Sequence, residues 1–186
     1  MSLQDLAVKI LSKPCPHPVR LVAVDGRAGS GKSTLAERLA EALGNAPVFP
    51  LDDFGSYVDI ISRWPQFEEQ VLVPLFQGRD ARYQARDWEG DYAGNSFKDW
   101  KDLPFAKTVI LEGVTSSRSA LADRLAFSIW VDAPQEVRLQ RGLDRDKGIP
   151  GIEELWRNFQ AMEDRFFAED DCRGRADVVV DGTKTY

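Results

Sequence analysis

Residues 25–34 read Asp-Gly-Arg-Ala-Gly-Ser-Gly-Lys-Ser-Thr, and the prediction of the fold starts from these residues. It fits the pattern G-x-x-x-x-G-K-[ST]. The apolar run at residues 20–24, just before it, predicts a buried strand, and leucines spaced four apart after it predict a helix. Strand, glycine-rich loop and helix in this order predict a phosphate-binding loop (P-loop, or Walker A motif). The alternative is a glycine-rich turn before an ordinary helix.

The residue types of this loop suit a nucleotide. Backbone N–H groups must approach a polyphosphate closely, and glycine removes the Cβ atoms that would obstruct them. The following helix adds the positive end of its dipole. Lys32 is expected to reach the β and γ phosphates, and the Ser33 hydroxyl is expected to ligate Mg²⁺. The predicted nucleotide-binding residues are Gly26, Arg27, Ala28, Gly29, Ser30, Gly31, Lys32, Ser33 and Thr34, with Thr34 in a structural role.

Composition indicates one globular domain over residues 1–186, with 43% hydrophobic and 29% charged residues. No apolar run approaches the roughly 18 residues of a membrane span, and residues 1–13 predict an amphipathic helix rather than a signal peptide. We therefore expect no membrane partner and a cytoplasmic protein. The net charge of −6 argues against a nucleic-acid polymer as partner. Two distant cysteines give no disulfide framework or zinc site.

Four further strands are predicted at residues 47–51, 107–113, 127–132 and 176–180, alternating with helices. This alternation predicts an α/β fold with a five-stranded parallel sheet flanked by helices, whose binding crevice lies at the carboxyl ends of the strands. Asp52 and Asp53 follow the second strand, where a turn or helix cap is the alternative. Glu112 ends the third strand, as a metal-binding Walker B carboxylate would, or is simply a strand-end acid.

Residues 59–78 predict one bent helix or two short helices, interrupted at Pro65. The following residues 78–92 are dense in arginine, aspartate and aromatic residues with weak periodicity, and we expect a long functional loop there. A charged surface excursion is the alternative. Arg and Asp side chains beside aromatic faces suit a small polar acceptor. The weaker candidates for contact with this acceptor are Asp53, Arg79, Tyr83, Trp88 and Arg118.

The helix predicted after Pro134 places Arg138, Arg141 and Arg145 on one side. Guanidinium groups in such a row suit the charge on a transferred phosphoryl group, although a solvated arginine face is the alternative. Residues 142–151, with glycines at both ends, are expected to form a small mobile lid. Apolar residues from Ile152 to Phe166 predict one face of a long helix packed in the core.

The ordered set of motifs resembles the uridine kinase/phosphoribulokinase branch of P-loop kinases. It comprises the phosphate loop, Leu51–Phe54, Ile110–Gly113, residues 131–146 and residues 176–180, and leaves 56–106 mostly unmatched. The resemblance implies a three-layer P-loop NTPase fold of the nucleoside/nucleotide kinase type, with an acceptor-binding insertion at about 56–106. It also implies transfer of the ATP γ-phosphoryl to a hydroxyl of a small metabolite, with Mg²⁺ held at Ser33 and Glu112. The family's nucleoside pocket uses a His and a Tyr, and the middle region of this chain contains no His.

The same resemblance implies site roles. Asp52, with Phe54 in a D-x-F setting, is the expected catalytic base, and Asp53 is the fallback. Lys32, Arg141 and Arg145 complete the catalytic set. The alternatives to a kinase are a nucleotide-binding regulatory ATPase and a non-catalytic ATP-binding module. The identity of the acceptor and the oligomeric state, a homodimer included, stay open at this point.

Overall fold

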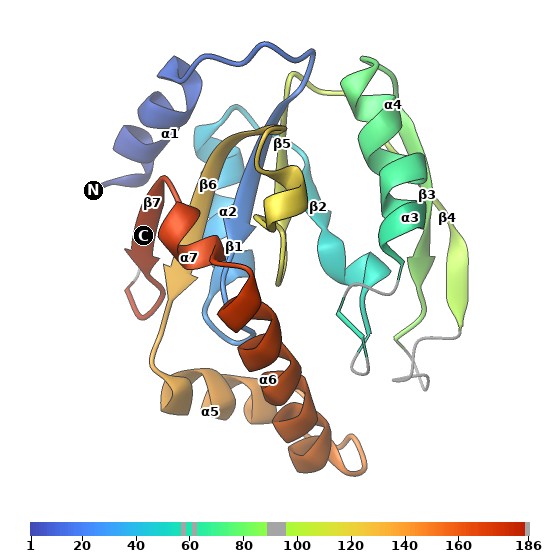
Figure 1. Cartoon of the computed structure of the whole chain (residues 1–186), viewed down its shortest axis with the longest axis vertical. Coiled ribbons are helices and arrows are strands. Elements are labelled where there is room, and N and C mark those ends of the chain that lie inside the picture. Colours follow the sequence, from blue (N-terminus) through green and yellow to red (C-terminus); the bar gives the residue numbers. More distant parts are fainter. Residues whose placement is uncertain (57–58, 61–62, 89–95, 185–186) are drawn as a thin grey trace.

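A computed structural model describes residues 1–56, 59–60, 63–88 and 96–184 (Figure 1). Its centre is a parallel sheet of five strands, as the sequence predicted, and the structure gives their order as β2-β5-β1-β6-β7. The strands are β1 (Arg20–Asp25), β2 (Val48–Pro50), β5 (Thr108–Glu112), β6 (Leu125–Asp132) and β7 (Val178–Asp181). Strand β1 lies in the middle of the sheet, so the phosphate loop that follows it lies at the centre of the carboxyl edge.

Alternating side chains of the central strands point into two separate cores. Val22 of β1 and Ile110 of β5 face the first core, together with α1 (Leu3–Ser12) and α2 (Lys32–Ala42). Leu21 of β1 and Leu111 of β5 face the second core, on the opposite side. Because both faces of the sheet are covered, the strands are buried nearly throughout. The predicted three-layer α/β fold is therefore confirmed.

The helical segment of the second core begins at Trp64, later than the sequence suggested. It runs without a break through α3 (Trp64–Phe67), a π turn η2 (Glu68–Leu72) and α4 (Val73–Phe76). Pro65 lies in the first turn, where its missing N–H is tolerated, so it starts the helix and does not interrupt it. The π turn precedes Pro74, which cannot donate the regular helical hydrogen bond.

The prediction of a long loop over residues 78–92 is wrong for much of this range. Residues in this range form β3 (Ala81–Arg86), which pairs with β4 (Phe97–Leu103) in an antiparallel hairpin sheet beside the second core (Figure 1). Ala81, Tyr83 and Ala85 alternate inward along β3 and are buried. The remainder of the predicted loop, including Tyr92, lies in 89–95, outside the described residues.

Two helices extend beyond the carboxyl edge of the sheet. They are α5 (Gln135–Arg145) and α6 (Ile152–Glu169), and both lie at the lower end of the molecule in Figure 1. The predicted lid, residues 142–151, therefore comprises the end of α5 and the connection to α6. Within the described part of the chain, no helix is both long and apolar enough to cross a membrane. The remaining elements are the 3₁₀ turns η1 (Leu51–Phe54) and η3 (Ser119–Leu121) and the short helix α7 (Cys172–Arg175).

Candidate active site

The phosphate loop connects β1 to α2 and takes a backbone conformation that requires glycine. Gly26, Gly29 and Gly31 all have positive φ angles, of 147°, 76° and 100°. A Cβ at Gly26 would collide with the backbone of β6, and one at Gly29 with the backbone of α5. A Cβ at Gly31 would crowd the carbonyl oxygen of Gly182 at 3.1 Å. The glycines thus allow neighbouring backbone to pack against the loop, a reason that the sequence argument did not include.

A cavity of about 550 Å³ opens beside this loop, at the carboxyl edge of the sheet. Its size suits a metabolite-sized ligand. Its walls come from the phosphate loop, η1, the end of β5, α5 and α6. Predicted site residues that line it are Ala28, Gly29, Gly31, Lys32, Ser33, Thr34, Asp52, Trp88, Glu112, Arg141 and Arg145. Most of the predicted nucleotide-binding and catalytic residues are therefore brought together.

Three charged side chains meet at the floor of the cavity. Burial raises the pKa of Glu112 to about 7, the positive charge of Lys32 opposes this rise, and the Ser33 hydroxyl is hydrogen-bonded to the Glu112 carboxylate. Desolvation also raises the pKa of Asp52, while Lys32 and Arg145 favour its charged form. Both carboxyl groups thus bind protons more strongly than in water. Asp52 is exposed into the cavity, whereas Glu112 is buried at its edge.

The donor set at Ser33 and Glu112 fits a magnesium ion. A hydroxyl oxygen and a carboxylate oxygen lie within hydrogen-bond reach of each other beside Lys32. Mg²⁺ in phosphoryl-transfer sites takes one or two protein oxygens and fills the rest of its octahedron with water and phosphate oxygens. The described residues contain no group of three or more His, Cys, Asp or Glu side chains placed to hold a metal. A site completed by a nucleotide needs no such group.

Asp53 is directed away from the cavity. Its carboxylate forms an ion pair with Lys101 of β4 at 3.0 Å and a hydrogen bond with Tyr83 of β3. Tyr83 is itself buried, with its ring packed against Phe49 and Phe54. The structure therefore gives both Asp53 and Tyr83 a role in fixing the hairpin to η1, and does not place either on the cavity wall.

The three arginines of α5 do not share one environment. Arg141 donates from Nη1 to the carbonyl oxygens of Gly29 and Gly182, at 3.3 and 3.1 Å. Arg145 lies at the cavity wall, where it pairs with Asp146 at 2.6 Å. Arg138 is buried instead, and its Nη1 lies 3.7 Å from the Glu163 carboxylate of α6. The single arginine face that the sequence predicted is thus divided between the cavity and the interior.

The cavity is also lined by residues that follow η1 and β3. Trp88 lines it, and the Arg86 guanidinium stacks on the Trp88 ring at 3.7 Å. Arg86 is buried, donates to the carbonyl of Gly55 at 2.8 Å and adds positive potential at Asp52. The sequence argument placed Arg86 in the acceptor loop but did not select it. Its position two residues before Trp88 is the signal that could have identified it.

Two predicted acceptor residues lie elsewhere. Arg79 is exposed and donates to the side chain of Gln77, because the chain turns away from the cavity before β3 begins. Arg118 is inserted between the rings of Trp64 and Phe166, at 4.2 and 5.7 Å from their centroids. Neither side chain lines the cavity. The structure therefore does not support a role for either residue in contacting an acceptor there.

The predicted core helix α6 covers the site. Of its apolar face, Trp156 is fully buried, while Phe159 is half-buried and lines the cavity beside it. Glu163 on the same face has no exposed surface and accepts a hydrogen bond from the Ala28 N–H at 2.5 Å. The sequence argument missed Glu163. A lone acidic residue within an apolar helical stripe was the available signal.

Comparison with known proteins agrees with this architecture. The family model described as AAA domain matches residues 22–164. A curated cytidylate kinase from Natronomonas pharaonis is 33% identical over 133 residues, which cover 69% of this chain and 60% of that protein. The chain thus spans about three fifths of the length of this relative.

Solved structures share the fold. One described as a possible uridine kinase from Bacillus stearothermophilus matches with a TM-score of 0.72 at 20% identity, covering 96% of this chain and 97% of that one. D-glycerate 3-kinase from Cryptococcus neoformans var. grubii matches with a TM-score of 0.66 at 15% identity, covering 98% and 96%. The chain therefore belongs to the AAA domain family of P-loop proteins, and its fold is that of the uridine kinase-like P-loop kinases.

Proposed function

We propose that this protein is an ATP-dependent kinase that transfers the γ-phosphoryl group to a hydroxyl of a small metabolite. The observation that carries this proposal is that Asp52, Lys32 and Trp88 line the same cavity of about 550 Å³. A cavity that served nucleotide binding alone would need no carboxylate beyond the phosphate loop. The similarity to a cytidylate kinase supports phosphoryl transfer. The hydroxyl as acceptor rests on the position of Asp52.

The phosphate loop would bind ATP through its backbone N–H groups and the Lys32 ammonium. Ser33 and Glu112 would hold Mg²⁺, Glu112 directly or through water. The ion supplies positive charge where negative charge develops on the transferred group. Lys32 begins α2 and is largely buried, with its Nζ 3.2 Å from the carbonyl oxygen of Arg27. The ammonium is thus held close to the loop before any ligand arrives.

Asp52 would orient the acceptor hydroxyl and accept its proton. This proposal is supported by the position of Asp52 in η1, where it lines the same cavity as the phosphate loop. A raised pKa makes a carboxylate a stronger base than one in water, which favours proton acceptance. Asp53 is engaged instead with Lys101 and Tyr83, which supports Asp52 for this task.

Arg141 and Arg145 would stabilise the negative charge of the phosphoryl group during its transfer. Both are anchored on α5, and the segment 142–151 would adjust as ligands bind. The acceptor would occupy the end of the cavity formed by residues of 56–106, including Ser56 and Trp88. Relatives named for cytidylate, uridine and glycerate keep both nucleosides and sugar acids among the acceptors to be tested.

The test is release of ADP from Mg-ATP across a panel of nucleosides, nucleoside monophosphates, sugars and sugar acids. Stimulation by one compound, abolished in Lys32→Ala and retained in the exposed surface variant Lys9→Ala, is the expected result. Turnover of ATP that no added compound stimulates would reject the kinase and favour a regulatory ATPase. Binding of ATP with no turnover would favour a non-catalytic binding module.

A further inference from the structure

Strand β4 is the outer strand of the hairpin sheet and presents an open edge. It pairs with β3 on one side, and within the described residues no strand pairs with its other side. Figure 1 shows β4 at the rim of the molecule, on the side away from α1 and β7. All its residues except Leu103 are exposed, and Trp100 retains 49% of its surface. An open edge with an exposed aromatic side chain can pair with another strand.

The sequence of β4, Phe-Lys-Asp-Trp-Lys-Asp-Leu, is complementary to itself when reversed. If two copies run antiparallel with the two Trp100 residues opposite each other, every charged residue faces the opposite charge. Opposite charges directly across an antiparallel pair stabilise it, and like charges destabilise it. The cross-strand pairs in this register are Lys98 with Asp102, Asp99 with Lys101, and Phe97 with Leu103.

Other registers lack this complementarity. A shift of the pairing by one residue places Lys98 opposite Lys101, or Asp99 opposite Asp102, depending on its direction. If the pairing shifts by two residues, Asp99 faces Asp99 of the second copy, or Lys101 faces Lys101 of the second copy, depending on the direction. Parallel pairing in register places every charge opposite itself. The charge pattern therefore selects one antiparallel register, which has two-fold symmetry.

We propose that two copies of this chain associate through their β4 edges, joining the two hairpins into one continuous four-stranded antiparallel sheet. Lysines on an edge strand usually oppose such pairing, but here each lysine meets an aspartate of the second copy. The ion pairs Arg82–Asp102 and Lys98–Asp87 within one chain are both long, at 3.7 Å, and the first of them is largely exposed. The exposed Asp102 side chain can therefore turn toward a partner at little cost.

The dimer is expected to be weak. One pair of seven-residue strands buries less than the roughly 1,200–2,000 Å² typical of stable interfaces. Its effect on the molecule is local, because the hairpin leads through Arg86 to Trp88 at the cavity. Association would brace the hairpin at the acceptor end of the cavity. This inference does not depend on the proposed reaction.

The test is sedimentation velocity of the full chain from about 10 µM to about 500 µM, the range in which a small interface associates. We expect a monomer–dimer equilibrium. Lys98→Asp places aspartates opposite Asp102, and Asp102→Lys places lysines opposite Lys98, so each variant alone should dimerise at least about tenfold more weakly. The control Lys9→Asp makes the same charge change as Lys98→Asp, but at an exposed position of α1, and should leave the equilibrium unchanged.

A mixture of the two variants gives the decisive result. In a one-to-one mixture, the chain with Lys98→Asp meets the chain with Asp102→Lys, and every cross-strand pair is again opposite in charge. We expect the mixture to regain wild-type association, which an effect on folding alone could not produce. A wild-type chain that stays monomeric throughout, single variants that dimerise as well as the wild type, or a mixture that stays monomeric would each overturn the proposal.

Discussion

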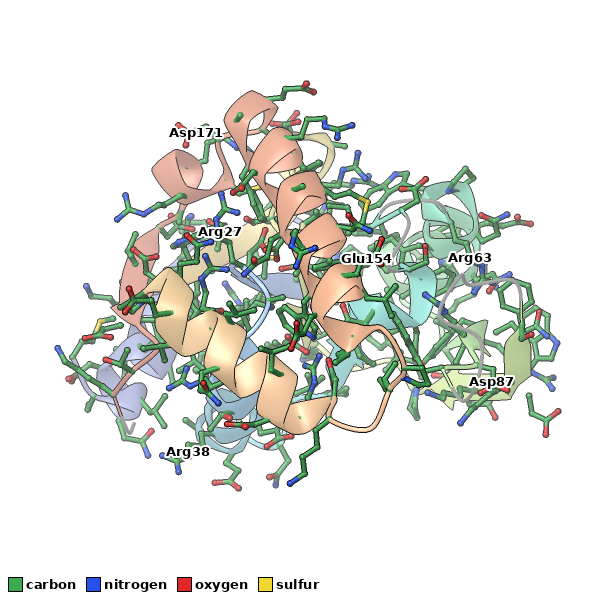
Figure 2. All side chains as sticks on the ribbon, turned by 90° about the horizontal axis from the view of Figure 1, so that it is seen from below. Arg27, Arg38, Arg63, Asp87, Glu154 and Asp171 are labelled. Carbon is green, nitrogen blue, oxygen red and sulfur yellow. The ribbon has the colours of Figure 1, made fainter. Side chains whose placement is uncertain are left out.

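Glu163 of α6 is bonded to the phosphate loop itself, since its Oε1 accepts the backbone N–H of Ala28 at 2.5 Å. Its other carboxylate oxygen lies 3.7 Å from Arg138 of α5 and 3.9 Å from Arg27 of the loop. Figure 2 looks onto α5 and α6 from this end, with Arg27 labelled beside them. One buried carboxylate thus connects the phosphate loop to both helices that cover the cavity.

Removing this carboxylate is expected to destabilise the fold. Glu163→Ala leaves Arg138 buried without its counter-charge and the Ala28 N–H without an acceptor, which together cost about 3 kcal/mol of unfolding free energy. Urea denaturation measures this loss. The neighbouring variant Asp164→Ala removes an exposed partner of Arg27 and should cost less than about 1 kcal/mol. Equal losses for the two variants would show that Glu163 does not hold the loop.

Prediction from sequence succeeded where the signal is local. The phosphate loop, the five parallel strands and the positions of Asp52 and Glu112 all follow from short motifs at strand ends, and the structure places them as expected. Such motifs fix backbone conformation within a few residues. They also share one edge of the sheet, because parallel strands all end on the same side.

Prediction failed where structure depends on distant contacts. Strand β4 has no buried alternation, since six of its seven residues are exposed, so only its pairing with β3 defines it. The Arg138 and Arg145 side chains lie two helical turns apart with the same sequence signal, and only the approach of Glu163 makes one of them interior. Arg118 was assigned to the acceptor site by its sheet edge alone, whereas aromatic rings from α3 and α6 enclose it.

The two adjacent aspartates should separate catalysis from stability. Asp52→Asn removes the proposed base and is expected to lower kcat by at least about 10²-fold, with ATP affinity retained. Asp53→Asn removes the partner of the half-exposed Lys101 and should cost about 1 kcal/mol or less, with kcat largely kept. Steady-state kinetics with the identified acceptor and thermal unfolding distinguish these effects. Full activity in Asp52→Asn would refute the assignment of the base.

Trp88 should determine acceptor affinity. It lines the cavity and belongs to the proposed acceptor-binding segment, so Trp88→Ala is expected to raise KM for the acceptor at least about tenfold. KM for ATP should stay unchanged. Arg79→Ala provides the comparison, because that side chain is exposed and outside the cavity, and its acceptor KM should equal that of the wild type. A parallel rise in KM for ATP would mean that Trp88 shapes the whole cavity.

Asp170 gives the fold a defined acid sensitivity. Burial opposes its charge, but hydrogen bonds from Ser119 and Arg175 prevail and lower the pKa of Asp170 from 3.8 to about 2. A carboxylate with a lowered folded-state pKa stabilises the fold above its unfolded pKa and loses this contribution as the pH falls through the folded one. Asp170→Asn is thus expected to cost about 1 kcal/mol at pH 7, after allowance for solvent screening.

The difference between wild type and Asp170→Asn should shrink between about pH 4 and pH 2 as the wild-type carboxylate binds its proton. Thermal unfolding across this range measures it. Asp123→Asn, an exposed acid elsewhere, should show little difference at any pH. A constant gap between wild type and Asp170→Asn would show that the asparagine disturbs packing rather than a charge-dependent hydrogen bond.

The arginines of α5 should have separable roles in catalysis and in folding. Arg145 lies at the cavity wall beside Asp52, whose charged form it favours, so Arg145→Ala is expected to lower kcat by about 10³-fold with little change in stability. Arg138→Ala should instead lower stability, because it leaves Glu163 buried without its counter-charge. Arg157→Ala on the exposed face of α6 is the control for loss of one positive charge and should change neither quantity. The contrary outcome is that Arg138→Ala lowers kcat as much as Arg145→Ala while the protein stays equally stable. Arg138 would then act in the reaction together with Arg145, and the separation of the two side chains between cavity and interior would not persist during turnover.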